Sequence, residues 1–458
     1  MRFPTLLRLS FLVALAAALG HLTGSCGLSP TGSEPPRAVI FVVLDNVRAD
    51  RLSLCGYGRP TSPFLEELRQ AGAAITCDAK APSTWTYPSH ASFFTGTELP
   101  VHSAGMGETP DSVRFDWGIQ ARPLGPELPT LAEAMAARGY STIMLSGNPV
   151  LSPHAGLARG FEEASVAERF GELYGPHLVR ELRRLLTGET ANDGRPLFLF
   201  VNISDAHQPW WRIPAKIDWL PERPRLAFHV DPRKGNTERQ GYVKGTLDPE
   251  AAEALLAHLS DVYDYAVRRA DTTLRGVVRA LDEVGWLADG YRLVVTSDHG
   301  ELLGEHRLLG HDGPYVYESL MQVPLVIAGS DPVPDLPSPI SAIEAFDLAL
   351  DGTLAQRPVR SAAYASPTWT RWFGAKIGGQ PGAAIWDGNQ KLVWQRGAFH
   401  LYDLDADPRE LSATPLGGHP LRDDLLTLAL AVKASVNHPV ETSPELTEQL
   451  EALGYLAR

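Results

Sequence analysis

The chain contains few cysteines and no excess of positive charge. Three cysteines in 458 residues are too few for a disulfide-built scaffold or a thiolate metal cluster. Lys and Arg total 41 against 54 Asp and Glu, so the net charge of −13 argues against a nucleic-acid partner. No apolar run beyond residue 19 is long enough to cross a bilayer, and no segment repeats at a fixed period. What is left is a globular protein that would need a local cationic site to bind a small anion.

The N-terminus has the pattern of an export signal. Arg2 and Arg8 precede the short apolar stretch 11–19, so residues 1–25 are predicted to be a signal peptide. The sequence "LTGSC" ends at Cys26 and resembles a bacterial lipoprotein cleavage site. We therefore expect a protein of the periplasm or cell surface whose only membrane attachment is a lipid on Cys26. The alternative is a plain signal peptide with an incidental cysteine.

The segment after Cys26 and the other two cysteines fit an exported protein. Residues 26–37 are rich in Pro, Gly and Ser, which predicts a linker. Cys55 and Cys77 can pair in an oxidising compartment, or they can remain unpaired thiols. Neither lies in a recognisable nucleophile setting, so a catalytic thiol is not expected.

Apolar strands alternate with helices along most of the chain. Runs such as "AVIFVVL" (38–44), "PLFLFVNIS" (196–204) and "YRLVVTS" (291–297) are typical of strands buried on both faces. Residues 62–72 predict a helix capped by Ser62, and residues 249–286 predict a long helix. The pattern indicates an α/β fold with a doubly wound sheet flanked by helices.

The chain divides by composition into two predicted parts. Residues 38–339 form the predicted catalytic domain, with an insertion at 208–245, rich in Pro, Trp and Arg, that could line a substrate site. Residues 340–458 predict a smaller C-terminal α+β subdomain, because "AAIWDGNQKLVWQRGAFHLYDL" reads as a turn-rich antiparallel hairpin followed by helices.

Acidic residues stand directly after three predicted strands. Asp45, Asp205 and Asp298 end these strands, and the last two are followed closely by His207 and His299. Because the carboxyl ends of strands in an open α/β sheet form the crevice where ligands bind, we expect these side chains to converge. Each acid alone could equally be a turn or helix cap.

Thr86 precedes "YPSHASFFTG", which predicts a helix with Pro88 in its first turn and Gly96 near its end. A hydroxyl at this position faces free backbone N–H groups and the positive end of the helix dipole. That environment favours an alkoxide and an anionic substrate. The alternative is that Thr86 merely caps the helix.

Several motifs in fixed order together resemble one family. They are "VVLDNVRADRLSLCGYGRPTSPFLEELRQAGA", "TWTYPSHASFFTG", "DAHQPW", "TSDHGELLGEHRLLGHDGPYVYESLMQVPLVI" and "LYDLDADPREL". The chain from about residue 38 to its end is similar to the sulfatase family of the alkaline phosphatase superfamily. The resemblance implies a large, mostly parallel central sheet flanked by helices, with a smaller C-terminal α+β subdomain.

The resemblance implies one divalent metal ion and a nucleophile at Thr86. The implied ligands are Asp45, Asp298 and His299, with Thr86 as a further ligand. Oxygen donors with one imidazole suit Ca²⁺, Mn²⁺, Mg²⁺ or Zn²⁺. Asn46 stands where many sulfatases have a second metal-binding aspartate.

The resemblance also suggests which residues contact the substrate. His207 and His311 correspond to positions that contact the transferred group, and a lysine is common at the second of them. His90, His102 and Arg48 are further candidates for substrate binding, although each could instead satisfy local hydrogen bonds.

The sequence departs from the family at the nucleophile. Sulfatases carry a cysteine or serine at the Thr86 position, convert it to formylglycine, and follow it with x-Pro-Ser-Arg. Threonine cannot undergo that conversion, and His90 replaces the arginine. Both departures favour a metal-bound threonine that attacks a phosphate ester directly.

Two functions follow from these observations. The first is an exported, metal-dependent hydrolase of a sulfate or phosphate ester, with phosphate favoured and the substrate a small anionic ester carried by a glycan or a lipid. The second is an inactive sulfatase-like lipoprotein that binds an anionic glycan or lipid.

Overall fold

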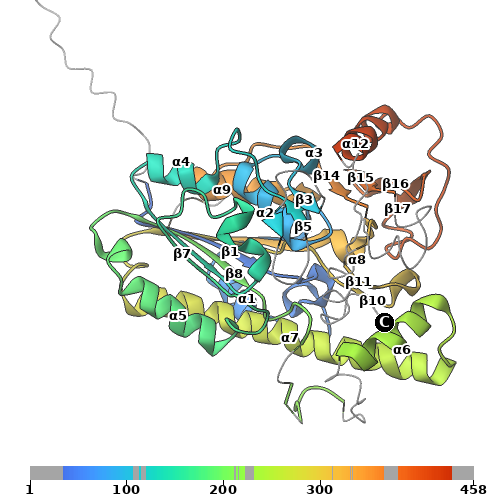
Figure 1. Cartoon of the computed structure of the whole chain (residues 1–458), viewed down its shortest axis with the longest axis horizontal. Coiled ribbons are helices and arrows are strands. Elements are labelled where there is room, and N and C mark those ends of the chain that lie inside the picture. The colour runs from blue at the N-terminus through green and yellow to red at the C-terminus, as the bar shows by residue number, and fades with distance from the viewer. Residues whose placement is uncertain are drawn as a thin grey trace, which may run out of the picture. The chain divides into compact units, whose positions relative to one another are not determined.

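The structure is a computed structural model of the whole chain (Figure 1). It describes residues 35–106, 113–114, 120–210, 213–214, 216–221, 232–311, 313–330, 332, 334–365 and 380–435. Residues 36–458 form one compact unit by their contacts. The predicted signal peptide and Cys26 lie outside the described residues, and the predicted domain boundary near residue 340 stays a prediction.

The centre of the fold is an eight-stranded mixed sheet. Its strands lie in the order β13-β2-β12-β9-β1-β8-β6-β7. Their bounds in that order are Ile340–Ser341, Ala74–Lys80, Gln322–Gly329, Tyr291–Thr296, Ala38–Leu44, Leu197–Ile203, Ser141–Ser146 and Glu163–Val166. Strand β12 runs antiparallel to both its neighbours, and the remaining pairs are parallel. The predicted sheet of mostly parallel buried strands is therefore confirmed.

Helices cover both faces of this sheet, as Figure 1 shows. Alternate residues of β1 point to opposite faces. Phe41 and its neighbours on one face pack in a core with residues of α2 (Thr86–Thr95), α4 (Leu131–Ala137) and α9 (Ala345–Leu350). Ile40 and its neighbours on the other face pack with α1 (Pro63–Gln70), α5 (Pro176–Leu186) and α7 (Pro249–Glu283). This two-sided burial explains why β1 is apolar at every position.

The helices predicted for residues 62–72, 86–96 and 249–286 are confirmed, with ends that differ by a few residues, and further helices lie between them. Their bounds are α1 Pro63–Gln70, α2 Thr86–Thr95, α3 Leu99–His102, α4 Leu131–Ala137, α5 Pro176–Leu186, α6 Pro232–Lys244, α7 Pro249–Glu283, α8 Glu318–Met321, α9 Ala345–Leu350 and α12 Arg422–Ser435. The 3-10 helices are η1 Ala49–Arg51, η2 Ser53–Cys55, η3 Pro149–Leu151, η4 Pro153–Ala155, η5 Thr190–Asn192, η7 Glu305–Arg307 and η8 Ala342–Glu344. No helix among the described residues has the length and apolarity that a bilayer crossing requires.

The N-terminus of α1 is capped by a different residue from the one predicted. Ser62 occupies the N-cap position of α1, but its hydroxyl accepts the N–H of Leu54. The first N–H groups of α1, those of Phe64 and Leu65, are instead bound by the carboxylate of Asp271 from α7, both at 3.0 Å. A long-range carboxylate thus replaces the local hydroxyl in satisfying the helix start.

The C-terminal part carries the predicted antiparallel sheet. Strands β14 Arg360–Ala363, β15 Gly382–Asp387, β16 Gln390–Gln395 and β17 Ala398–Asp403 pair in sequence order. Helix α12 packs on this sheet through Leu425, Leu428 and Val432. Two smaller sheets are formed by β10 Leu302–Leu303 with β11 Leu309–Gly310, and by β3 Gly105–Met106, β4 Val113–Arg114 and β5 Gln120–Arg122.

Buried charges join the C-terminal sheet to the central one. The ammonium group of Lys391 in β16 lies 2.8 Å from Glu318 and 2.7 Å from Glu410. Glu318 also lies 2.6 Å from Lys80 of the central strand β2. The positive and negative groups balance, which is the condition under which buried charges are tolerated.

Cys55 and Cys77 form a disulfide that links η2 to β2, with a sequence separation of 22 residues. A loop of this length restricts the unfolded chain enough to contribute about 3 kcal/mol to the free energy of unfolding. We expect Cys55→Ser with Cys77→Ser to lower that free energy by this amount in chemical denaturation. Equal stability of the variant and of the oxidised wild type would contradict the pairing.

Candidate active site

The ends of the central strands bring two of the three predicted acids, Asp45 and Asp298, to one place. Asp45 follows β1, while Asp298 and His299 follow β9, and all three are fully buried. One potential ligand atom from each lies within 4.8 Å of the others. Among the described residues these three form a possible metal-binding group, as the strand-end argument predicted.

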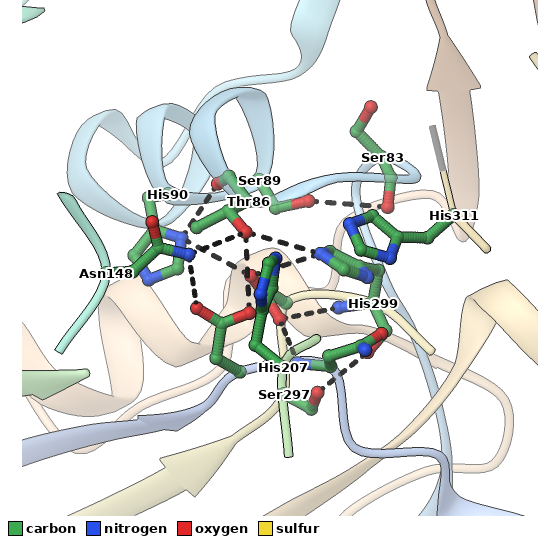
Figure 2. Close-up of polar contacts among 12 residues, drawn as sticks. Ser83, Thr86, Ser89, His90, Asn148, His207, Ser297, His299 and His311 are labelled. Atoms are coloured by element: carbon green, nitrogen blue, oxygen red, sulfur yellow. Dashed lines mark hydrogen bonds and ion pairs between the residues drawn. The ribbon is translucent and has the colours of Figure 1, made fainter. Parts of the chain in front are cut away.

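Thr86 is the first residue of α2 and faces this group (Figure 2). Its hydroxyl lies 3.4 Å from Asp45 Oδ1, 3.4 Å from His299 Nε2 and 3.3 Å from Asn148 Nδ2. Trp85, not Thr86, occupies the N-cap position, and no side chain caps the helix there. The hydroxyl of Thr86 therefore points at the carboxylate of Asp45 and the imidazole of His299 rather than at the helix N–H groups.

The buried acids have the electrostatics of a cation site. Burial, and then the charge of Asp45, raise the pKa of Asp298 well above its ordinary value. Asp298 Oδ2 is buried and accepts no hydrogen bond. Two buried carboxylates this close repel each other unless a cation lies between them. The residues present therefore fit a divalent metal ion.

His299 has the protonation pattern of a metal ligand. Its Nδ1 lies 2.9 Å from the carbonyl oxygen of Gly300, which places the ring proton on Nδ1 and leaves Nε2 toward Thr86. Burial and the neighbouring His311 lower the pKa of His299 to about 3. A neutral imidazole with its lone pair in the site is the form that coordinates metals.

Two asparagines outside the predicted set of site residues support the site. Asn148, just after β6, donates to Asp45 Oδ2 at 2.7 Å, and Asn202 of β8 donates to the same oxygen at 3.1 Å. Both are fully buried. The one available hint was that Asn202 is polar within an apolar strand, since a buried amide needs partners.

His207 and His311 lie beside each other at the edge of the site. Their ring centroids are 5.2 Å apart, and the ring of His311 is 4.5 Å from that of His299. Phe170 stacks on His207 with centroids 4.8 Å apart. His207 is 5% and His311 6% exposed, and Figure 2 shows both in the same group of side chains as Thr86.

His90 lies behind Thr86. Its Nδ1–H donates to the carbonyl oxygen of Thr86 at 2.8 Å, and its ring packs edge-on against Phe93, Phe94 and Phe200. Burial lowers the pKa of His90 to about 4, which keeps the ring neutral. His90 thus makes local contacts with the turn that carries Thr86, and its Nδ1 also lies 3.7 Å from Asp298 Oδ2. A role in substrate binding stays a prediction.

His102 and Arg48 make local contacts, which was the alternative for each. His102 bonds Ser92 Oγ at 2.9 Å and accepts the N–H of Ala104 at 3.0 Å. The guanidinium of Arg48 donates to Asp50 and Glu305, each at 2.7 Å, and to the carbonyl oxygen of Glu301. The structure does not bring either side chain into contact with Thr86.

A family model described as Sulfatase matches residues 37–375, most of the chain. The chain belongs to the sulfatase family.

Curated relatives match over part of their length. The chain is 25% identical over 269 residues to arylsulfatase K of Xenopus laevis, covering 48% of each chain. It is 31% identical over 165 residues to the multifunctional alkaline phosphatase superfamily protein PehA of Trinickia caryophylli, covering 31% of this chain and 30% of the relative. The match thus spans half or less of the length of these relatives.

Solved structures share the fold. The phosphonate monoester hydrolase of Agrobacterium radiobacter has a TM-score of 0.57 at 19% identity, covering 87% of this chain and 96% of that one. A 2-O GAG sulfatase has a TM-score of 0.58 at 16% identity, with 90% and 96% covered. A protein solved with its substrate D-glucosamine-2-N,6-O-disulfate has a TM-score of 0.57 at 15% identity, with 88% and 98% covered.

Proposed function

We propose that this protein is an exported, metal-dependent hydrolase of an anionic ester, with Thr86 as its nucleophile. The observation that supports this most directly is the hydroxyl of Thr86, which lies within 3.4 Å of Asp45, His299 and Asn148 and does not cap its own helix. A hydroxyl needed only for folding has no reason to lie between a buried carboxylate and a neutral imidazole.

The residues divide the chemical work between them. Asp45, Asp298, His299 and Thr86 would hold the ion, which when bound lowers the pKa of a coordinated hydroxyl and polarises the ester. Thr86 Oγ1 forms a bond to phosphorus as the bond to the ester oxygen breaks, and the proton of the hydroxyl leaves with the departing alcohol. Water then cleaves the phosphothreonine, which releases the phosphate and returns a proton to Thr86 Oγ1. Asn148 Nδ2, 3.3 Å from Thr86 Oγ1, orients the hydroxyl. His207 and His311 border the transferred group, and in the imidazolium form their Nε2–H groups would donate hydrogen bonds to its oxygens.

A phosphate ester suits a threonine better than a sulfate ester does. Formylglycine releases sulfate by restoring an aldehyde, and this route needs a second hydroxyl on the same carbon. Thr86 has one hydroxyl, so its ester must be cleaved by water at phosphorus or sulfur. The family includes glycan sulfatases, and among the similar structures one holds a sulfated glucosamine, which supports a glycan as the carrier of the ester.

A substrate panel tests the proposal. Purified protein with Mn²⁺, Ca²⁺, Mg²⁺ or Zn²⁺ is assayed on aryl phosphate, phosphodiester, phosphonate and sulfate esters. We expect the highest kcat/KM on a phosphate mono- or diester. Turnover of the sulfate ester alone would contradict the preference for phosphorus.

The second candidate is a lipoprotein that binds an anionic glycan or lipid without turnover. The loss of the formylglycine residue and of its arginine partner, replaced by Thr86 and His90, favours it. This second function is disfavoured by a possible metal-binding group, because a binding protein has no need of metal ligands. The group consists of Asp45, Asp298 and His299. Folded protein that takes up no divalent metal under any condition would favour this second function.

Export and lipid attachment belong to the proposal. The disulfide between Cys55 and Cys77 supports an oxidising compartment. We expect the full chain to fractionate with membranes and Cys26→Ser to be either unprocessed or released, as read by fractionation and by mass spectrometry of the mature N-terminus. An unlipidated mature protein that begins elsewhere would contradict the anchor.

A further inference from the structure

A buried carboxylate outside the proposed metal set contacts the site. Glu301 is fully buried and lies two residues beyond His299. Its Oε2 lies 2.6 Å from Asn46 Nδ2 and 3.2 Å from His311 Nδ1. A buried carboxylate costs free energy unless its partners are strong donors, so this arrangement needs an explanation.

The contact to His311 fixes the orientation of a ring that the proposed mechanism uses. The carboxylate lies at Nδ1, which makes Nδ1 the protonated nitrogen and puts Nε2 on the opposite side of the ring. The same ring packs 4.5 Å from His299 and 5.2 Å from His207, measured between centroids. Of these three contacts, the two ring contacts do not distinguish the nitrogens of His311, whereas the hydrogen bond to Glu301 is made by Nδ1.

We propose that Glu301 is a positioning residue that holds His311 through Nδ1, so that Nε2 meets the ester group bound at Thr86. This inference rests on the proposed function, since it assigns a task to His311 in that reaction. An imidazole replaces the lysine that is common at this position in the family, and a ring has two nitrogens where an ammonium group has one. The carboxylate of Glu301 thus determines which nitrogen of the His311 ring faces the ester.

The competing explanation is that Glu301 acts through its other partner. Asn46 has a positive φ of 67° and donates its own N–H to Asp298 Oδ1 at 2.9 Å. Glu301 could thus support the strained turn after β1 rather than His311. The two explanations differ in which second substitution cancels the effect of removing Glu301.

A double-mutant cycle separates them. We expect Glu301→Ala to lower kcat about 10- to 100-fold, the usual cost of losing a residue that orients an active-site imidazole. In a His311→Ala background, the same substitution should cost less than about threefold, because its partner is already gone. If Glu301→Ala lowered kcat by the same factor in the wild-type and His311→Ala backgrounds, the proposal would be overturned. Glu301→Gln keeps an accepting oxygen and is expected to retain more activity than Glu301→Ala.

Glu305→Gln is the matched control. This carboxylate lies four residues further on and binds Arg48 at 2.7 Å. Its effect on kcat, whatever its size, should be the same in the wild-type background and in the His311→Ala background.

Nitrogen NMR of histidine-labelled protein tests the contact without turnover. In the wild type we expect the imidazole signals of His311, assigned with His311→Ala, to show the proton on Nδ1, and this pattern to be lost in Glu301→Ala. A wild-type ring protonated on Nε2 alone would overturn the proposal. If no ester is hydrolysed at all, the proposed function fails while the NMR result still decides whether Glu301 positions His311.

Discussion

Replacing Thr86 by alanine is expected to lower kcat on the best ester substrate by at least about a thousandfold, because loss of a nucleophile leaves only binding and electrostatic effects. The hydroxyl that would be lost lies 3.4 Å from both Asp45 Oδ1 and His299 Nε2. The measurement is steady-state kinetics at saturating metal, together with thermal unfolding to show that the fold is kept.

Thr86→Ser is the matched control for this prediction. Serine keeps the hydroxyl and loses one methyl group, whose burial is worth about 1 kcal/mol, so its activity should remain within about tenfold of the wild type. Equal losses in the serine and alanine variants would mean that shape at Thr86, rather than its oxygen, matters.

Chelation of the metal is expected to abolish activity and to lower the thermal stability of the wild type. A ligand present at 100 times its Kd stabilises the folded state by about 2.7 kcal/mol. Asp298→Asn should remove this metal-dependent increase in the free energy of unfolding. The reason is that the substitution neutralises one of the two buried carboxylates that would hold the ion. The metal-free variant should be at least as stable as metal-free wild type, since the repulsion between Asp298 and Asp45 is removed.

Asp205→Asn is the control for the metal prediction. Asp205 is also a buried acid just past a central strand, but it forms an ion pair with Arg269 at 2.9 Å and accepts the N–H of Gly175. Its substitution should lower stability with and without metal and leave the metal-dependent gain intact. A metal-dependent gain that survives Asp298→Asn would contradict the proposed ligand set.

The sequence was informative where residues share a pattern with their neighbours. Apolar runs predicted the buried strands, and the rule that strand ends converge predicted that Asp45, Asp298 and His299 would lie together. The same rule grouped Asp205 with them, although its carboxylate is bound by Arg269. The end of a strand predicts where an acid lies. Whether that acid can bind a metal depends on a neighbouring charge, here that of Arg269 on α7.

The sequence was uninformative where a single residue reaches across the fold. Asn148 contacts Asp45, and Asp271 caps α1 from 206 residues away, without any local signature. Asn202 also contacts Asp45, and its polarity within an apolar strand was the only hint. His90 is an intermediate case. Its place four residues after Thr86 on the helix predicts a contact with that turn, but only the surrounding phenylalanines show that it is buried and neutral.

Mass spectrometry of enzyme quenched in acid during turnover of a phosphate ester tests the central claim most directly. The account predicts a phosphate group on Thr86 in the wild type, and none in Thr86→Ala under the same conditions. Full hydrolytic activity in Thr86→Ala, or a phosphate group trapped on a different side chain, would contradict it.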